Sequence, residues 1–153
     1  MKASYICEFS IGRLIIMEED GAITRIELAE QQSGDNDGWE TPLIKSAAAQ
    51  LREYFSGRRR QFDLPLAPKG TPFQKKVWAA LCEIPYGETR TYGQIAEKVG
   101  NPKASRAVGM ANHNNPIMIV IPCHRVIGAN GSLTGYAGGL SVKQQLLDLE
   151  QEK

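Results

Sequence analysis

The sequence is poor in the residues that bind metals or form disulfide bridges. Its 153 residues include 3 cysteines and 2 histidines. The cysteines are far apart and odd in number, which argues against a disulfide framework and favours a reducing compartment. No pair of them has the spacing of metal ligands, so we expect neither a metal site nor a cofactor. These residues are Cys7, Cys82, Cys123, His113 and His124.

Long apolar runs are also absent. No stretch approaches the roughly 18 consecutive apolar residues that a membrane-spanning helix needs, and the first residues lack the apolar core of a signal peptide. We therefore expect a cytoplasmic protein with no membrane partner. The hydrophobic fraction of 42% and the charged fraction of 23% are ordinary for a globular protein. The length suits one large domain or two small ones.

The formal net charge is only +1, but it is unevenly distributed. Residues 1–69 carry 9 basic and 11 acidic side chains, a net −2, whereas residues 70–153 carry 9 basic and 6 acidic ones, a net +3. The second part is thus the better candidate for binding a polyanion, although ordinary surface variation gives similar imbalances.

The first 70 residues predict a small antiparallel sheet followed by a helix. Three segments rich in Ile, Leu, Phe and Tyr are separated by turn residues. Later, Thr41 and Pro42 have the character of a helix N-cap and a first helical residue. A stretch with Pro65, Pro68 and Gly70 then separates this part from the rest. The expected elements are strands at 4–9, 12–18 and 21–28, a loop at 31–38, a helix at 41–55 and a short strand-like segment at 62–66.

Residues 71–153 predict a mostly helical domain. Apolar residues recur at helical spacing after Thr71 and Pro72. Two short helices at 92–99 and 103–112 follow, joined by a break at 100–102, which is the pattern of a helix-turn-helix motif. The apolar run at 117–121 indicates a buried strand or strand-like segment, and a last helix is expected at about 141–150. The expected fold class is therefore α+β, with domains at 1–70 and 71–153.

The second helix of the helix-turn-helix pattern is slim, because small residues predominate in it and Arg106 is the long charged side chain in its middle. A helix that reads the major groove normally presents several polar side chains. This one is better suited to pressing against a narrow groove with one inserted side chain. Tight packing within the protein would require the same slimness. The small residues are Ala104, Ser105, Ala107, Gly109 and Ala111.

Cys123 and His124 place a nucleophile beside a base, at the end of the apolar run. The thiolate is the reactive form of cysteine, and it needs a base or a positive environment at neutral pH; Arg125 is next in sequence. Neighbours in an extended chain point to opposite faces, so His124 would need a local turn or a water to take the proton. Asp148 or Glu150 could then orient the imidazole. For an isolated Cys-His pair, a structural thiol beside a satisfied histidine is the alternative.

Several separated motifs resemble the O6-alkylguanine-DNA alkyltransferases, also called methylated-DNA–protein-cysteine methyltransferases. The sequence Ile-Pro-Cys-His-Arg-Val at 121–126 is similar to the active-site signature of that family, and the resemblance extends over most of 71–150. Residues 1–70 resemble the family's ribonuclease-H-like domain in general layout only. The other matching segments are Tyr92, 101–109, Asn115-Pro116, 135–140 and 143–150.

The resemblance implies DNA repair by direct alkyl transfer. Cys123 would accept a methyl or larger alkyl group from O6 of guanine in double-stranded DNA, with O4 of thymine as a second candidate. The product thioether is stable, so each molecule would act once. A stacked base cannot be reached at O6, so the scheme requires base flipping, with the protein bound as a monomer in the minor groove.

The resemblance also implies five catalytic residues. His124 would deprotonate Cys123 through a water, with Glu150 orienting the imidazole. Asn115 would brace the turn that carries the cysteine. Tyr92 would donate its hydroxyl proton to the guanine as it leaves.

The remaining implied roles concern DNA. Arg106 would enter the base stack and fill the space of the flipped nucleotide. Ala137 stands where some relatives have serine, so only its backbone can be assigned a role. His113 stands where some relatives have arginine, so the phosphate contact of that arginine is not assigned to it. Metal ligands of some relatives have no matching set here. The further residues are Ala104, Ser105 and Ala107 at the DNA, and Tyr92, Val126, Tyr136, Ala137 and Gly138 at the base.

Other classes of function are possible readings of parts of this sequence. A non-catalytic sensor of alkylated DNA would resemble this family but lack the acceptor cysteine. A helix-turn-helix regulator would leave the Cys-His-Glu set without a use, and a cysteine hydrolase would need an amide or ester pocket that no motif suggests. The three arginines at 58–60 are either a phosphate contact or a solvated surface.

Overall fold

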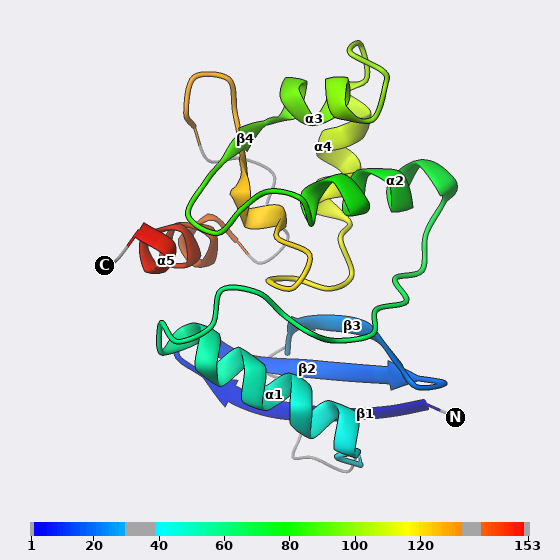
Figure 1. Cartoon of the computed structure of the whole chain (residues 1–153), viewed down its shortest axis with the longest axis vertical. Helices are drawn as coiled ribbons and strands as arrows, with labels where there is room; N and C mark the ends of the chain where they lie inside the picture. Colours follow the sequence, from blue (N-terminus) through cyan, green and yellow to red (C-terminus); the bar gives the residue numbers. More distant parts are fainter. Residues whose placement is uncertain (1, 30–38, 133–138, 152–153) are drawn as a thin grey trace. The chain divides into compact units, whose positions relative to one another are not determined.

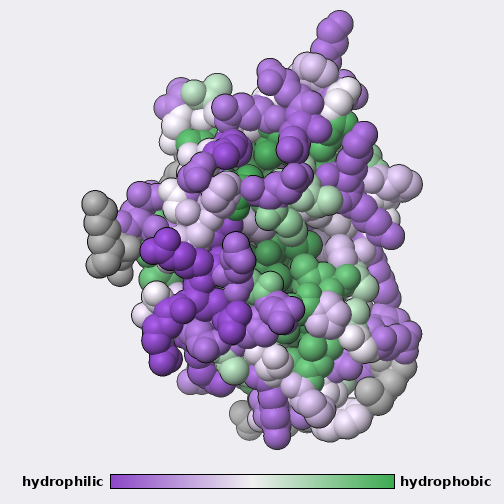
Figure 2. Space-filling model, viewed as in Figure 1, coloured by the Kyte–Doolittle hydropathy of each residue, from purple (hydrophilic) through white to green (hydrophobic). Residues whose placement is uncertain are grey.

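The computed structural model describes residues 2–29, 39–132 and 139–151. The chain divides into two compact units, Met1–Lys69 and Gly70–Lys153. On the face that Figure 2 shows, hydrophilic residues predominate at the surface. Among the described helices, none has the length and apolar character needed to cross a membrane. The α+β fold class expected from the sequence is confirmed.

The first unit is a three-stranded antiparallel sheet with a helix packed on it. The strands β1 (Lys2–Phe9), β2 (Gly12–Glu19) and β3 (Ala22–Leu28) pair in chain order. The helix α1 (Pro42–Phe55) lies across the sheet and packs against all three strands (Figure 1). The core between them is formed by fully buried aliphatic side chains, among them Leu14, Ile16, Ile23, Ile26, Ile44 and Leu51.

Local sequence explains where these elements begin and end. Asp20 and Gly21 both have positive φ, 52° and 83°, which is the requirement of the tight turn that joins two twisted antiparallel strands. At α1, the Thr41 hydroxyl accepts a hydrogen bond from the Ile44 N–H at 3.1 Å and donates one to the buried Glu18 carboxylate. The expected strand at 62–66 is reduced to one bridge, where Leu66 pairs with Ile23 of β3.

The second unit consists of short elements. Its helices are α2 (Pro72–Leu81), α3 (Tyr92–Lys98), α4 (Ser105–His113) and α5 (Leu140–Gln151). The two-residue strands β4 (Arg90–Thr91) and β5 (Val126–Ile127) pair in parallel, and the 3-10 turn η1 (Cys123–Arg125) leads directly into β5. Figure 1 shows α3 and α4 side by side, with α2 beside α4. The indole N–H of Trp78 ties α2 to α4 by donating to the Ala111 carbonyl at 2.8 Å.

The helix-turn-helix motif is formed by α3 and α4. Thr91 and Gln94 form a reciprocal capping box that starts α3. Gly100, with φ 86°, ends it. The second helix begins at Ser105, two residues later than the sequence predicts, because a separate turn precedes it, in which the Ala104 N–H donates to the Asn101 carbonyl at 3.0 Å.

Candidate active site

The buried apolar run before Cys123 is a folded turn, and the prediction of a strand at 117–121 is wrong. Ile119 has φ 74°, and the Val120 N–H donates to the Met118 carbonyl at 2.8 Å. This is a γ-turn of the rarer and more strained form. A second three-residue turn follows at Pro122, with φ −81° and ψ 64°, where the Cys123 N–H donates to the Ile121 carbonyl at 2.8 Å.

Asn115 is the physical reason for this turn. Its side-chain oxygen accepts from the Ile117 N–H at 3.0 Å, and its Nδ2 donates to the Ile121 carbonyl at 2.8 Å. Backbone groups that would pair with a neighbouring strand are thus bonded locally. The side chain of Asn115 therefore ties together both ends of the segment that leads to Cys123.

Cys123 and His124 share one 3-10 turn and are both buried, with exposed fractions of 3% and 0%. The Arg125 N–H closes the turn by donating to the Pro122 carbonyl at 3.0 Å. In such a turn, successive side chains are about 120° apart. The side chains of Cys123 and His124 therefore do not point to opposite faces, as they would in an extended chain.

Glu150 of α5 holds both residues that follow the cysteine. Its Oε2 lies 2.7 Å from Nε2 of His124. Arg125 grips the same carboxylate as a fork, with Nε donating to Oε1 at 2.8 Å and one terminal nitrogen donating to Oε2 at 2.9 Å. Its other terminal nitrogen donates to the Ile84 carbonyl at 2.8 Å. Such charge-assisted paired bonds fix orientation strongly.

The charges around His124 favour a neutral imidazole. Burial lowers the pKa of His124, and this outweighs the opposing effect of Glu150. The positive charges of Arg125 and Lys143 lower the pKa of His124 further. With Nε2–H donating to Glu150, Nδ1 carries the free lone pair. Within the described residues, Nδ1 is buried and has no hydrogen-bond partner, so it is available to accept a proton.

The last helix carries a residue that the sequence reasoning missed. The apolar residues of this helix predict an inner side formed by Val142, Leu146, Leu147 and Leu149, whereas the residues it buries are Lys143, Leu146 and Glu150. Nζ of Lys143 donates to the Val126 carbonyl at 2.5 Å. Burial lowers the pKa of Lys143 to about 8. The available signal was the spacing of 143, 146 and 150, which places two charged residues on one helical face with a leucine.

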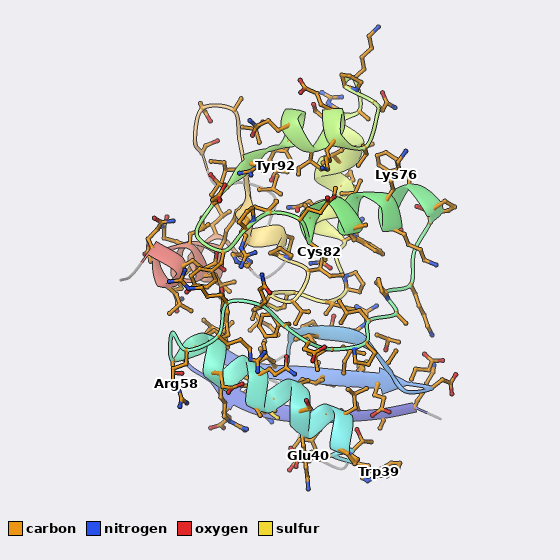
Figure 3. The ribbon with its side chains drawn as sticks, in the orientation of Figure 1. Trp39, Glu40, Arg58, Lys76, Cys82 and Tyr92 are labelled. Carbon is orange, nitrogen blue, oxygen red and sulfur yellow. The ribbon has the colours of Figure 1, made fainter. Side chains whose placement is uncertain are left out.

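The candidate DNA-contacting residues lie at the start of α4. Arg106 and Ala107 are exposed, whereas Ala104 and Ser105 are half-buried. The half-buried Tyr92 begins α3, as Figure 3 shows. A side chain at Gly109 would place its Cβ 3.9 Å from the Tyr92 ring, so that ring lies close to the backbone of α4.

The remaining sequence-predicted residues divide into two groups. Val126 is buried and pairs with Arg90 of β4, so the segment after Cys123 is registered against the chain that enters α3. Tyr136, Ala137 and Gly138 lie outside the described residues. Over the described ranges, no group of three or more His, Cys, Asp or Glu side chains is arranged to hold a metal ion.

The arginines at 58–60 lie at the end of α1. Nε of Arg58 donates to the Ser56 hydroxyl at 2.9 Å, and Nε of Arg59 donates to Glu53 at 2.9 Å. Arg59 also donates to the Gln61 carbonyl at 2.9 Å. These bonds give the first two arginines a part in closing the helix end.

Comparison with known proteins identifies relatives of both units. Residues 72–152 match the model of the 6-O-methylguanine DNA methyltransferase DNA binding domain, and residues 1–68 match the ribonuclease-like domain of the same family. A methylated-DNA–protein-cysteine methyltransferase from Methanosarcina acetivorans is 63% identical, over 95% of this chain and 96% of its own length. The constitutive enzyme of that name from Bacillus subtilis is 51% identical, over 94% and 92%.

Solved structures agree. The O6-methylguanine methyltransferase of Mycobacterium tuberculosis superposes with a TM-score of 0.89 at 44% identity, covering 99% of this chain and 93% of that one. A structure of the M. tuberculosis protein OGT in complex with DNA superposes with a TM-score of 0.86 at 45% identity, covering 97% and 92%.

Proposed function

This chain belongs to the 6-O-methylguanine DNA methyltransferase family, and on that premise we propose that it transfers an alkyl group from O6 of guanine in DNA to Sγ of its own Cys123. The observation that carries the proposal is the buried series Cys123, His124 and Glu150, in which the carboxylate is fixed by Arg125. That series supplies a nucleophile, a neutral base and an oriented acceptor.

The first step is the formation of the thiolate. Nδ1 of His124 takes the proton of Cys123 through a bridging water, and Glu150 accepts the Nε2–H bond that keeps the correct nitrogen unprotonated. Burial supports this role, because it keeps the imidazole unprotonated at neutral pH and so able to accept a proton.

The second step is the displacement. Sγ of Cys123 attacks the alkyl carbon, the S–C bond forms, and the C–O6 bond breaks with its electron pair going to the guanine. Tyr92 donates its hydroxyl proton to the departing base, so the base need not leave as an anion. The product thioether has no leaving group that water can replace, and no group in the proposed scheme regenerates the thiol. One turnover per molecule follows.

DNA engagement is assigned to the second unit, residues 71–153, which carries both the chemistry and α4. The guanine must leave the base stack to present O6, at a cost of a few kcal/mol that is smaller for a poorly paired lesion. Arg106, exposed on α4, fills the vacated stack, and the small side chains of Ala104, Ser105 and Ala107 allow close approach to the minor groove. Backbone groups at Val126 and at 136–138 read the edge of the flipped base.

Intact-protein mass spectrometry tests the proposal. The protein is incubated with a duplex carrying one O6-methylguanine, beside Cys123→Ala and Cys82→Ala. Cys82 is exposed and free, so Cys82→Ala is the matched control for a reactive surface thiol. We expect one methyl group per chain in the wild-type protein and in Cys82→Ala, and none in Cys123→Ala.

Each result separates functions. A gain that saturates at one methyl per chain establishes the acceptor and the stoichiometry together. A gain that disappears in Cys82→Ala would move the acceptor to the surface thiol. Binding of the lesion duplex without any gain would reduce the protein to a sensor of alkylated DNA. The same assay with O4-methylthymine tests the second substrate, and sedimentation of the complex tests the monomer.

A further inference from the structure

Lys143 is a buried charge that the proposed mechanism does not use. Its side chain has an exposed fraction of 0%, in the first turn of α5. Lysine is among the residues least often fully buried, because removing its ammonium from water is costly. A methionine would fill the same helical face without that cost, so the charge calls for a physical use.

The electrostatic surroundings of Lys143 point to Cys123. The negative charge of a Cys123 thiolate raises the pKa of Lys143 against the larger lowering effect of burial. Nζ also donates to the carbonyl of Val126, three residues after the cysteine and directly after η1. The ammonium is therefore held by the segment that carries the nucleophile.

The other charged groups near this turn are matched among themselves. In η1, Arg125 is bound by Glu150 of α5, and His124 is neutral. At the end of α2, desolvation by neighbouring atoms raises the pKa of the Cys82 thiol although the residue is exposed, so Cys82 adds no charge. On β4, Arg90 pairs with Glu88 at 3.1 Å. Because Arg125 and Glu150 cancel, the ammonium of Lys143 supplies the net positive charge held against the segment that carries Cys123.

We propose that Lys143 is a positioning residue whose buried ammonium stabilises the Cys123 thiolate and fixes the Val126 carbonyl, and that alkylation of the sulfur removes the negative charge to which the ammonium is matched. Lys143 does not take part in the proton transfer, since the thiol proton goes to His124. This inference deepens the alkyl transfer proposed above and rests on it for its purpose, although its first test needs no DNA. Its consequence is that Lys143 loses its proton more readily in alkylated protein.

The first test is the ionisation of Cys123. Thiolate absorbance near 240 nm is followed against pH in wild type, Lys143→Met, Lys143→Arg and Lys76→Met, each after subtraction of the matching Cys123→Ala protein. Lys76 is an exposed lysine on α2 and serves as the matched control (Figure 3). We expect Lys143→Met to raise the Cys123 pKa by about one unit, a tenfold loss of thiolate at neutral pH. Lys143→Arg should restore part of the shift, and Lys76→Met should have none.

A purely structural lysine would give a different result. If Lys143→Met is folded by circular dichroism and its Cys123 titrates as in wild type, the ammonium only tethers α5 to Val126 and the inference is wrong. Lesion-transfer rates in the same proteins keep the two proposals apart. We expect about a tenfold slower transfer at pH 7 for Lys143→Met, with recovery at higher pH. A shifted titration in a protein that takes no methyl from DNA would remove the proposed function and leave the charge pairing.

A second measurement covers the case in which Lys143→Met does not fold. In Cys82→Ala protein, methyl methanethiosulfonate converts the Cys123 thiolate into a neutral methyl disulfide and releases methanesulfinate. The Lys143 ammonium is titrated by nitrogen NMR before and after, with Lys76 as the internal reference. We expect the pKa of Lys143 to fall by about one unit after modification. An unchanged Lys143 titration would overturn the inference.

Discussion

The two units of this chain bury different kinds of side chain. In Met1–Lys69, long regular elements enclose an aliphatic core, and the buried polar side chains hold the ends and edges of α1; the buried Glu18 carboxylate accepts from the Thr41 hydroxyl that caps the helix. Thr41 caps α1, and Gln50 exchanges hydrogen bonds of 3.0 and 2.9 Å with the backbone of Asp63. In Gly70–Lys153, four titratable residues are buried around a cysteine that follows two tight turns; they are His124, Arg125, Lys143 and Glu150.

This contrast shows where burial indicates chemistry. A buried amide or hydroxyl bonded to the backbone is explained by the fold alone. A group of buried charges costs stability unless each is matched, and perturbed titratable groups concentrate at functional sites for that reason. The first unit contains polar burial of the structural kind, and the second contains the functional kind. The following predictions test that distinction.

The largest expected difference lies between a buried and an exposed ion pair. Arg125→Met leaves the Glu150 carboxylate buried beside His124 without its fork, and we expect a loss of about 3–5 kcal/mol in the free energy of unfolding. Arg59→Met is the matched change in the first unit, where the Arg59 and Glu53 side chains are 29% and 43% exposed. It should cost no more than about 1 kcal/mol. Urea unfolding of both variants gives the comparison.

Equal losses would contradict the distinction. A small loss for Arg125→Met would mean that Glu150 takes up a proton when its partner is removed. In that case, the stability of Arg125→Met would fall as the pH rises above the ordinary carboxylate range, because the folded chain would keep a proton that the unfolded chain releases. Wild type would not show this, so the pH dependence of unfolding identifies the cause.

A second prediction compares two buried isoleucines. Ile16 lies in regular strand β2 and Ile119 in the strained turn, with exposed fractions of 0% and 1%. Replacement by glycine removes the same side chain at both positions, but at φ 74° it also relieves a conformation that costs a branched residue about 1–3 kcal/mol. We expect Ile119→Gly to be less destabilising than Ile16→Gly by about that amount in urea unfolding.

Ile119→Val provides the control, because valine keeps both the branch and the strain. It should cost about 0.5–1.5 kcal/mol, like Ile16→Val. If the two glycine variants are equally destabilised, the turn before Cys123 stores no strain, and its geometry is held by Asn115 at no cost.

How far the sequence predicts this molecule depends on how local each determinant is. Thr41-Pro42 and Thr71-Pro72 place the starts of α1 and α2 correctly, because a cap acts within one helical turn. The apolar residues at 117–121 predict a strand, whereas the groups that decide the turn are the oxygen and the nitrogen of the Asn115 side chain. Composition cannot show which backbone groups a single amide will capture.

The site shows the same limit. The resemblance supplied Cys123, His124 and Glu150, and the structure brings His124 and Glu150 to 2.7 Å. The resemblance did not predict that Arg125 binds the Glu150 carboxylate, or that Lys143 is buried. A helical pattern treats lysine and arginine as solvent-facing, so their burial becomes visible only once the distant segments at 123–126 and 143–150 are packed together.

The third prediction concerns pH. Because burial lowers the pKa of His124 from the ordinary value of 6.5, its imidazole should remain neutral at pH 6.5. The unfolded chain takes up a proton there and the folded chain does not, so the free energy of unfolding should fall as the pH drops below 6.5. The slope from this group is at most about 1.4 kcal/mol per pH unit.

Proton NMR of the imidazole signals measures the titration directly. The chain has 2 histidines, so His113→Gln assigns both signals. A midpoint of His124 above 6.5 would mean that Glu150 holds an imidazolium, and that Arg125 does not neutralise it. The site would then begin its reaction with the base already protonated.

The smallest expected effect separates the two units as DNA-binding surfaces. Lys103, exposed just before α4, and Arg58, exposed after α1, are single cations outside the proposed catalytic residues. If the DNA interface belongs to the second unit, Lys103→Ala should lower the slope of log affinity against log salt by about 0.9, the value for one phosphate contact. Arg58→Ala should leave the slope unchanged, because its unit carries a net charge of −2 and its guanidinium is engaged with Ser56. The slopes for wild type and both variants are measured by fluorescence anisotropy with an undamaged duplex at several salt concentrations. The reverse pattern would make the arginines at 58–60 a phosphate contact and give the first unit a direct part in binding DNA.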